Sequence, residues 1–170
     1  NDPEGRHAGY YDPTVELLAI RRPNGEVEAL LVNFGCHPVC YGCQNQGISG
    51  DYVSYLKDAL ETQGAAKIVL FTVSGHANID PRDCVQNEAA VPRHLGEILA
   101  EQVRAALPRL SPVALGAVAA AHEPWIFVTN WAISGRLAIY YPHAATGSRV
   151  ETSVSCLAVG NCALLGIPGE

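Results

Sequence analysis

The sequence contains no methionine and only 3 phenylalanines, and charged residues make up just 16% of it. The formal net charge is -6 and no run of basic residues occurs. The composition therefore argues against nucleic acid as a partner and against a membrane surface bound through lysine and arginine. No stretch reaches the roughly 18 apolar residues of a transmembrane helix. No secretory signal peptide is visible either.

The missing methionine bears on what kind of chain this is, because a complete reading frame begins with one. A chain that starts at Asn1 and stops at Glu170, directly after an apolar run, is expected to be processed or a fragment. Segments could be missing upstream, downstream and around residues 123–149. Absent targeting signals then leave the compartment undecided.

The six cysteines are scattered through a chain long enough to build a core without crosslinks, so free, partly buried thiols are expected. This usage favours the cytoplasm. The cysteines are Cys36, Cys40, Cys43, Cys84, Cys156 and Cys162.

The length and the apolar content predict one globular α/β domain spanning residues 1–170, with a mixed β-sheet and helices packed on it. Strands are expected at 14–21, 27–34, 67–73, 113–121, 150–159 and 163–167. Helices are expected at about 51–63, with Ser49 as N-cap, and at about 90–107. Residues 123–147 have no clear pattern and are interpreted as a substrate-facing insertion or a break in the chain.

The first three strands form a predicted unit. Asn24-Gly25 between two apolar runs indicates a β-hairpin. The consecutive apolar residues of the second and third strands indicate strands covered on both faces. A helix between those two strands makes a right-handed crossover, which is expected to be parallel.

His37 follows the second strand, at the end where open α/β sheets bind ligands. A histidine there could be a metal ligand, a general base or a satisfied structural group. Its neighbours suggest a further alternative, because Cys36, His37, Cys40 and Cys43 have a spacing that could form a closed zinc or iron–sulfur site.

A second polar loop, SGHANIDP at residues 74–81, follows the third strand. Gly75 and Ala77 permit close backbone approach, and backbone N–H groups there could bind an oxyanion. His76 and Asp80 could be acid/base groups. The alternative is an ordinary turn in which Asn78 and Asp80 bond to local backbone.

Three segments, in the same order, resemble the catalytic domain of the neutral/alkaline, non-lysosomal ceramidase family. They are DPTVELLAIRRPNGEVEALLVNFGCHPV, ISGDYVSYL and ALLGIPGE. Together they cover nearly the whole chain. The resemblance implies that the chain is part of a ceramidase-like catalytic domain.

The resemblance also implies a zinc held by two histidines, a glutamate and a tyrosine. By motif match, His37 and Glu170 are the zinc ligands in this chain. The family's other histidine belongs to an upstream His-Thr-His-Ser-Gly segment, and its tyrosine lies beyond the glutamate. Neither occurs here, so these 170 residues alone are expected to bind zinc weakly and not to turn over.

Asp80 stands where the family has a serine thought to act on the amide. We expect it to serve as general base toward a zinc-bound water, which puts N-acylsphingosine as substrate in doubt and keeps zinc-assisted hydrolysis. His76 replaces a usually small residue and could add a ligand or an acid. Asp51 is a candidate to hold the metal ligands in place without contacting the metal itself, and the alternative is that it caps the helix.

The sequence therefore predicts a zinc-dependent hydrolase of an amide or ester bond, acting on a small or lipid-like molecule. Two other classes stay open. One is a non-catalytic binding or scaffold protein with the same fold, and the other is a metal or redox protein that uses Cys36, Cys40 and Cys43. The oligomeric state is left open.

Overall fold

The computed structural model describes residues 11–77, 79–114, 116–128 and 149–168. Contacts divide the chain into two compact units, Asn1–Leu110 and Ser111–Gly169. Each unit is described by itself. The expectation of one domain over residues 1–170 stays a prediction.

The first unit contains a three-stranded sheet in the order β1-β2-β3. Strand β1 (Val15–Arg21) pairs antiparallel with β2 (Val27–Phe34), and Gly25 in the turn has a φ of 87°. Strand β3 (Ile68–Thr72) pairs parallel with β2, and helix α1 (Asp51–Thr62) connects the two. Both the predicted hairpin and the predicted parallel crossover are confirmed.

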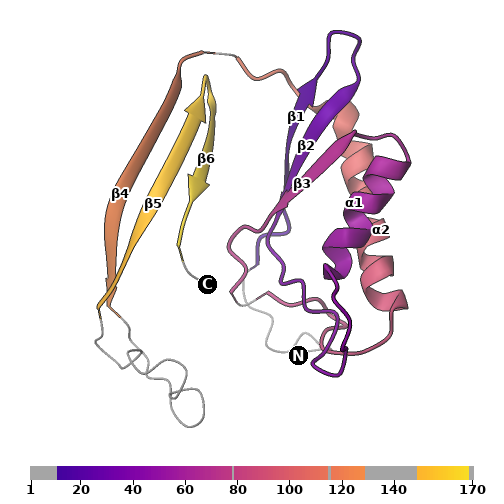
Figure 1. The fold of residues 1–170 in the computed structure, drawn as a ribbon. Coiled ribbons are helices and arrows are strands. Elements are labelled where there is room, and N and C mark those ends of the chain that lie inside the picture. The colour runs from indigo at the N-terminus through magenta and orange to yellow at the C-terminus, as the bar shows by residue number, and fades with distance from the viewer. Residues whose placement is uncertain (1–10, 78, 115, 129–148, 169–170) are drawn as a thin grey trace. The chain divides into compact units, whose positions relative to one another are not determined.

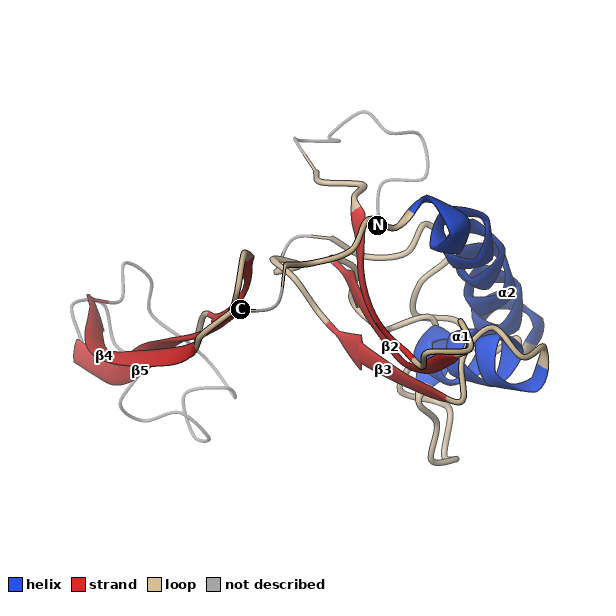
Figure 2. Ribbon diagram, turned by 90° about the horizontal axis from the view of Figure 1, so that it is seen from above, coloured by secondary structure: helices blue, strands red, loops and turns tan. Residues whose placement is uncertain are grey.

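Both helices of the first unit lie on the same face of this sheet (Figures 1 and 2). Helix α2 (Ala90–Ala106) runs beside α1 and continues into a short 3-10 helix, η1 (Leu107–Arg109). The core lies between sheet and helices. Its fully buried large side chains include Leu30, Val32, Val69, Tyr52, Leu56, Leu60 and Val103.

The opposite face of the sheet corrects one expectation. Strands β2 and β3 were predicted to be covered on both faces, but side chains alternate in β3: Val69 is buried whereas Ile68 and Leu70 are 52% and 53% exposed. The continuous apolar run suggested that both faces of the strand are buried. In the first unit, however, the helices cover only one face of the sheet.

The second unit is an antiparallel sheet of β4 (Val118–Val128), β5 (Arg149–Val159) and β6 (Cys162–Gly166). A strand was predicted at residues 113–121, and these bounds were wrong. Strand β4 begins at Val118 and continues through Trp125 to Val128. Trp125 and Phe127 contact each other, with ring centroids 6.2 Å apart. Residues 129–148, the rest of the stretch without a pattern, lie outside the described residues.

These elements make the protein a mixed α/β structure, as the sequence predicts. Within the described residues, neither helix is both long and apolar enough to cross a bilayer.

Candidate functional site

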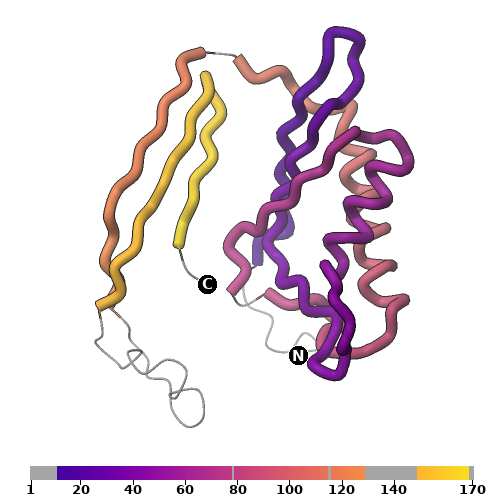
Figure 3. The backbone as a smooth tube through the Cα atoms, viewed as in Figure 1, coloured from indigo at the N-terminus to yellow at the C-terminus, as the bar shows by residue number. Residues whose placement is uncertain are grey.

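The two polar loops predicted to carry the site meet at one edge of the first sheet. Because β2 and β3 are parallel, the loops that follow them leave the same edge, as the tube in Figure 3 shows. The His37 N–H of the first loop donates to the Ile79 carbonyl of the second at 2.9 Å, and further along the chain the Val85 N–H donates to the Val39 carbonyl at 2.9 Å. The backbone therefore holds the two loops side by side.

Gly35, directly after β2, allows the backbone of this segment to lie close to Ser74 and Gly75 of the other loop. A Cβ built on Gly35 would lie 2.7 Å from Ser74 Oγ and 2.9 Å from the Gly75 carbonyl oxygen. Real Cβ contacts are longer than this, so only glycine fits without a shift. The sequence analysis did not single out Gly35, although a glycine between a strand and a candidate site residue is a recognisable signal.

His37 is held chiefly by the backbone of Ile79. Its main-chain N–H donates to the Ile79 carbonyl at 2.9 Å, and its ring Nδ1 lies 3.2 Å from the same oxygen. Asp80 Oδ1 is 3.5 Å from Nδ1. The His37 side chain is 19% exposed and that of Asp80 51%. An imidazole fixed at Nδ1 and partly exposed has the setting of a ligand or base.

His76 comes from the other loop and reaches the same place. Its Nδ1 lies 2.8 Å from the Ser74 carbonyl oxygen, and its ring contacts that of His37 with centroids 4.4 Å apart at 64°. The structure thus brings together three of the predicted site residues, His37, His76 and Asp80.

The remaining candidates of the loop and the C-terminus are placed less fully. Gly75 has nothing within 4 Å of where a Cβ would be, and Ala77 is exposed, so both leave open space in the loop. Asn78 and Glu170 lie outside the described residues. Their predicted roles, in the oxyanion loop and as zinc ligand, stay predictions.

Asp51 begins α1 and is the one buried charged residue among those described. Its φ is 54°, an uncommon value for a non-glycine residue. Its carboxylate accepts the Tyr41 N–H at 2.9 Å and the Tyr52 N–H at 2.7 Å, so it ties the loop to the helix. Tyr52 in turn donates its hydroxyl to the Cys36 carbonyl at 2.7 Å. Asp51 therefore supports the segment that carries His37, chiefly through backbone.

Ser49 was predicted as the N-cap of this helix, and that prediction was wrong. The cap residue is Gly50, without a side-chain cap, and Ser49 Oγ instead accepts the Asp51 N–H at 3.0 Å. Asp51 itself has a left-handed φ, and its carboxylate accepts the Tyr52 N–H in the first turn of the helix.

The cysteines are all free, as predicted. Cys36 and Cys40 are buried and Cys43 is exposed. Burial, together with the carboxylates of Asp80 and Asp51, raises the pKa of the Cys36 thiol to about 11, and burial with a hydrogen bond to Asp51 raises the pKa of Cys40. Both thiols are therefore protonated near neutral pH.

No set of three or more His, Cys, Asp or Glu side chains within the described ranges is arranged to hold a metal ion. The closed site considered for Cys36, His37, Cys40 and Cys43 is therefore not formed.

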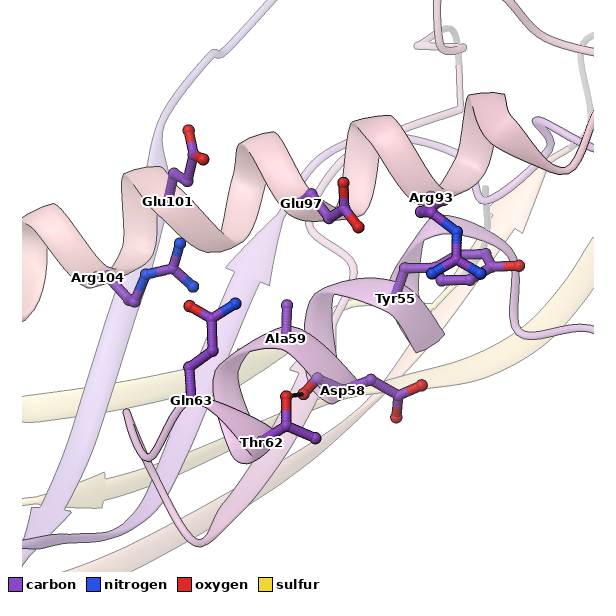
Figure 4. Close-up of a pocket in the computed structure, with 9 residues that line it drawn as sticks. All are labelled: Tyr55, Asp58, Ala59, Thr62, Gln63, Arg93, Glu97, Glu101 and Arg104. Carbon is purple, nitrogen blue, oxygen red and sulfur yellow. Dashed lines mark hydrogen bonds between the residues drawn. The ribbon is translucent and has the colours of Figure 1, made fainter.

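A separate hollow lies between α1 and α2 (Figure 4), and its lining includes neither His37 nor His76. Ala59 forms part of its lining. At one end Arg93 lies over the Tyr55 ring, with its guanidinium carbon 4.7 Å from the centroid. At the other end Arg104 extends toward Gln63, and its Nη1 is buried without a hydrogen-bond partner. The hollow is a groove between the two helices, and its lining carries charges of both signs.

Comparison with solved structures gives the fold a context. Neutral ceramidase from Pseudomonas aeruginosa matches with a TM-score of 0.68 and 14% identity, over 92% of this chain and 34% of that one. A ceramidase complexed with C2 matches with a TM-score of 0.73 and 16% identity, over 98% and 38%. The fold is therefore ceramidase-like, and the chain spans little more than a third of these proteins. No protein-family profile matches the sequence, and no curated protein resembles it in sequence.

Proposed function

We propose that this chain forms part of a zinc-dependent hydrolase that cleaves an amide or ester bond, with His37 as a zinc ligand. The ceramidase-like fold supports the reaction class. The single observation that carries the role of His37 is its fixed ring at the shared edge of β2 and β3.

The tautomer of His37 fits a metal ligand. A carbonyl oxygen can only accept, so the contact between Nδ1 and the Ile79 oxygen requires the proton on Nδ1. In the neutral ring, Nε2 then carries the lone pair. Metal-binding histidines usually donate their other N–H to a carbonyl or carboxylate in this way, which orients the ring. Glu170 is proposed as a further ligand by motif match.

When bound, zinc lowers the pKa of its water toward about 7 and polarises a carbonyl oxygen. Asp80 would accept the proton of the attacking water, because about half of its side chain is exposed to solvent beside His37. Gly75 and Ala77 leave room in the adjoining loop for the substrate. The substrate would be a small or lipid-like amide.

Metal analysis tests the proposal on the natural polypeptide that contains these 170 residues. We expect about one zinc per chain, lost in His37→Ala and kept in His94→Ala, whose histidine is exposed on α2. Less than about a tenth of a zinc per wild-type chain, or full zinc in His37→Ala, would overturn the proposal. The first result would favour the scaffold protein, which the replacement of the family's serine by Asp80 also motivates.

The role of Asp80 gives a separate prediction. Asp80→Asn should keep the bound zinc and reduce kcat on N-acyl amine substrates by about 10²–10⁴, the usual contribution of a general base. Zinc content and initial rates on the same preparation would check it. Asp83→Asn, an exposed carboxylate three residues further on, is the control and should keep both.

A further inference from the structure

The Tyr52 side chain connects helix α1 to both parallel strands of the first sheet. It lies in the first turn of the helix and is fully buried. Its ring contacts that of Phe71 in β3 edge to face, with the centroids 6.0 Å apart at 86°. Its hydroxyl donates to the Cys36 carbonyl, in the segment that follows β2, at 2.7 Å. A single buried side chain therefore contacts the segment that leads into His37.

The peptide group between Cys36 and His37 is held from both sides. Its carbonyl oxygen accepts the Tyr52 hydroxyl at 2.7 Å, and its N–H donates to the Ile79 carbonyl at 2.9 Å. A peptide group is planar, and in the trans form its C=O and N–H point in opposite directions. The plane therefore cannot rotate without breaking one of these two hydrogen bonds, and it fixes the direction in which the His37 side chain leaves the backbone.

The first turn of α1 also holds the other end of this segment. The Asp51 carboxylate accepts the Tyr41 N–H at 2.9 Å. Two consecutive helix residues thus fix the backbone of residues 36–41 at its two ends. Asp51 acts at the end away from His37, whereas Tyr52 acts on the peptide group that His37 shares with Cys36.

The hydroxyl of Tyr52 can be separated from the packing of its ring. A phenylalanine at position 52 would keep the contact with Phe71 and nearly the same volume in the core, but the Cys36 carbonyl would lose this hydrogen bond. A buried tyrosine hydroxyl needs a partner, and a carbonyl oxygen can only accept. Removing the hydroxyl therefore changes the support of the His37 peptide and leaves the core packed.

We propose that Tyr52 is a positioning residue for the proposed reaction. Its hydroxyl holds the Cys36–His37 peptide group, and thereby the His37 imidazole, in the orientation that the reaction requires. The effect on the reaction rests on the proposed function. The effect on the peptide group does not, so the two can be measured separately.

Hydrogen exchange of the His37 amide tests the support of the peptide group directly. The natural polypeptide would carry isotope-labelled histidine, and the His37 amide signal is the one lost in His37→Ala. In Tyr52→Phe we expect this amide to exchange about 5–10-fold faster and its signal to shift, because the loss of one hydrogen bond has an effect of this order. The amide of His94 in α2 is the internal control and should keep its rate. Circular dichroism would show that the variant is folded.

Steady-state kinetics on an N-acyl amine substrate test the consequence for the reaction. Tyr52→Phe should lower kcat by about 10–100-fold, because a misplaced site residue costs a factor of this order, and should leave KM near the wild-type value. Val103→Ala is the control for stability. It removes part of a buried core side chain of α2, so it should destabilise the fold and keep kcat.

Two results would overturn the inference. One is wild-type exchange of the His37 amide in folded Tyr52→Phe, and the other is a loss of kcat no larger than that of Val103→Ala. With either result, zinc that is bound by the wild type and lost in His37→Ala would leave the proposed function standing. A wild-type protein that neither binds zinc nor turns over would instead end the proposed function, and the positioning role with it, even if the His37 amide exchanges faster in Tyr52→Phe.

Discussion

Among single residues, the Cys36 thiol gives the chain a pH dependence. Its pKa is about 11 in the folded protein against an ordinary 9.0, because it is buried beside carboxylates. A raised pKa stabilises the fold below pH 9, and this contribution disappears as pH rises through 11. Urea unfolding should therefore show the free energy of unfolding falling between these pH values by about 2 kcal/mol more in wild type than in Cys36→Ala.

The exposed Cys43 is the control for this prediction. The Cys43→Ser variant should follow the wild-type pH curve, since this exposed side chain is not part of the buried core. Equal curves for wild type and Cys36→Ala would show that the Cys36 thiol titrates in the folded protein as it does in the unfolded one.

Gly35 is a second test at this scale. In Gly35→Ala the new methyl group meets Ser74 Oγ, which can rotate, and the Gly75 carbonyl, which cannot move without the loop. We expect a loss of about 1–3 kcal/mol of stability and shifted imidazole NMR signals for His37 and His76. Gly75→Ala, which points into open space, should change neither.

Single residues also show what sequence reasoning can reach. His37, His76 and Asp80 could be found because their side-chain types and strand-end positions carry the signal. The part played by Ile79 could not, because it acts through a carbonyl that every residue possesses. The positive φ of Asp51 was hidden for a related reason, since an acidic residue at a helix start normally indicates an ordinary first turn.

At the scale of elements, the packing of α1 on α2 depends on Gly96. A Cβ there would lie 2.5 Å from the Tyr52 carbonyl oxygen, 2.7 Å from Tyr55 Cβ and 2.8 Å from the Leu56 nitrogen. Alanine favours an isolated helix by up to about 1 kcal/mol over glycine. We nevertheless expect Gly96→Ala to destabilise the protein by about 1–3 kcal/mol in urea unfolding, because two of the three contacts are backbone.

The neighbouring exposed residue provides the matched control. Glu97→Ala adds helix propensity without entering the contact, and its unfolding free energy should stay within about 0.5 kcal/mol of wild type. A stabilised Gly96→Ala variant would mean that the helices separate readily at this point.

Most elements were predictable because periodicity and turn signals mark them locally. The bounds of β2 and the hairpin at Gly25 are examples. The start of β4 was not predictable. The small residues before Val118 have the sequence pattern of a strand, but the pairing of β4 with β5 begins only at Val118. The exposed side of β3 was missed because an apolar run cannot say which of its faces is covered.

For the molecule as a whole, the two units differ in how much they bury. The fully buried residues described in the structure all belong to the first unit, and none lies in β4, β5 or β6. In the 170-residue chain, hydrogen exchange should therefore be slowest in β2 and α1 and faster in all strands of the second unit. Mass spectrometry of peptic fragments would measure it, and equal protection in both units would contradict the expectation.

The double use of the Ile79 carbonyl has a consequence for how such a site can change in evolution. Because a main-chain oxygen orients His37, another apolar side chain can replace that of Ile79, which packs against the core, with little effect on the imidazole. What cannot vary is spacing: one residue inserted or deleted between 76 and 79 would put a different carbonyl, or none, beneath the ring. Relatives that keep this arrangement should tolerate apolar substitutions at position 79 and resist changes in the length of the loop.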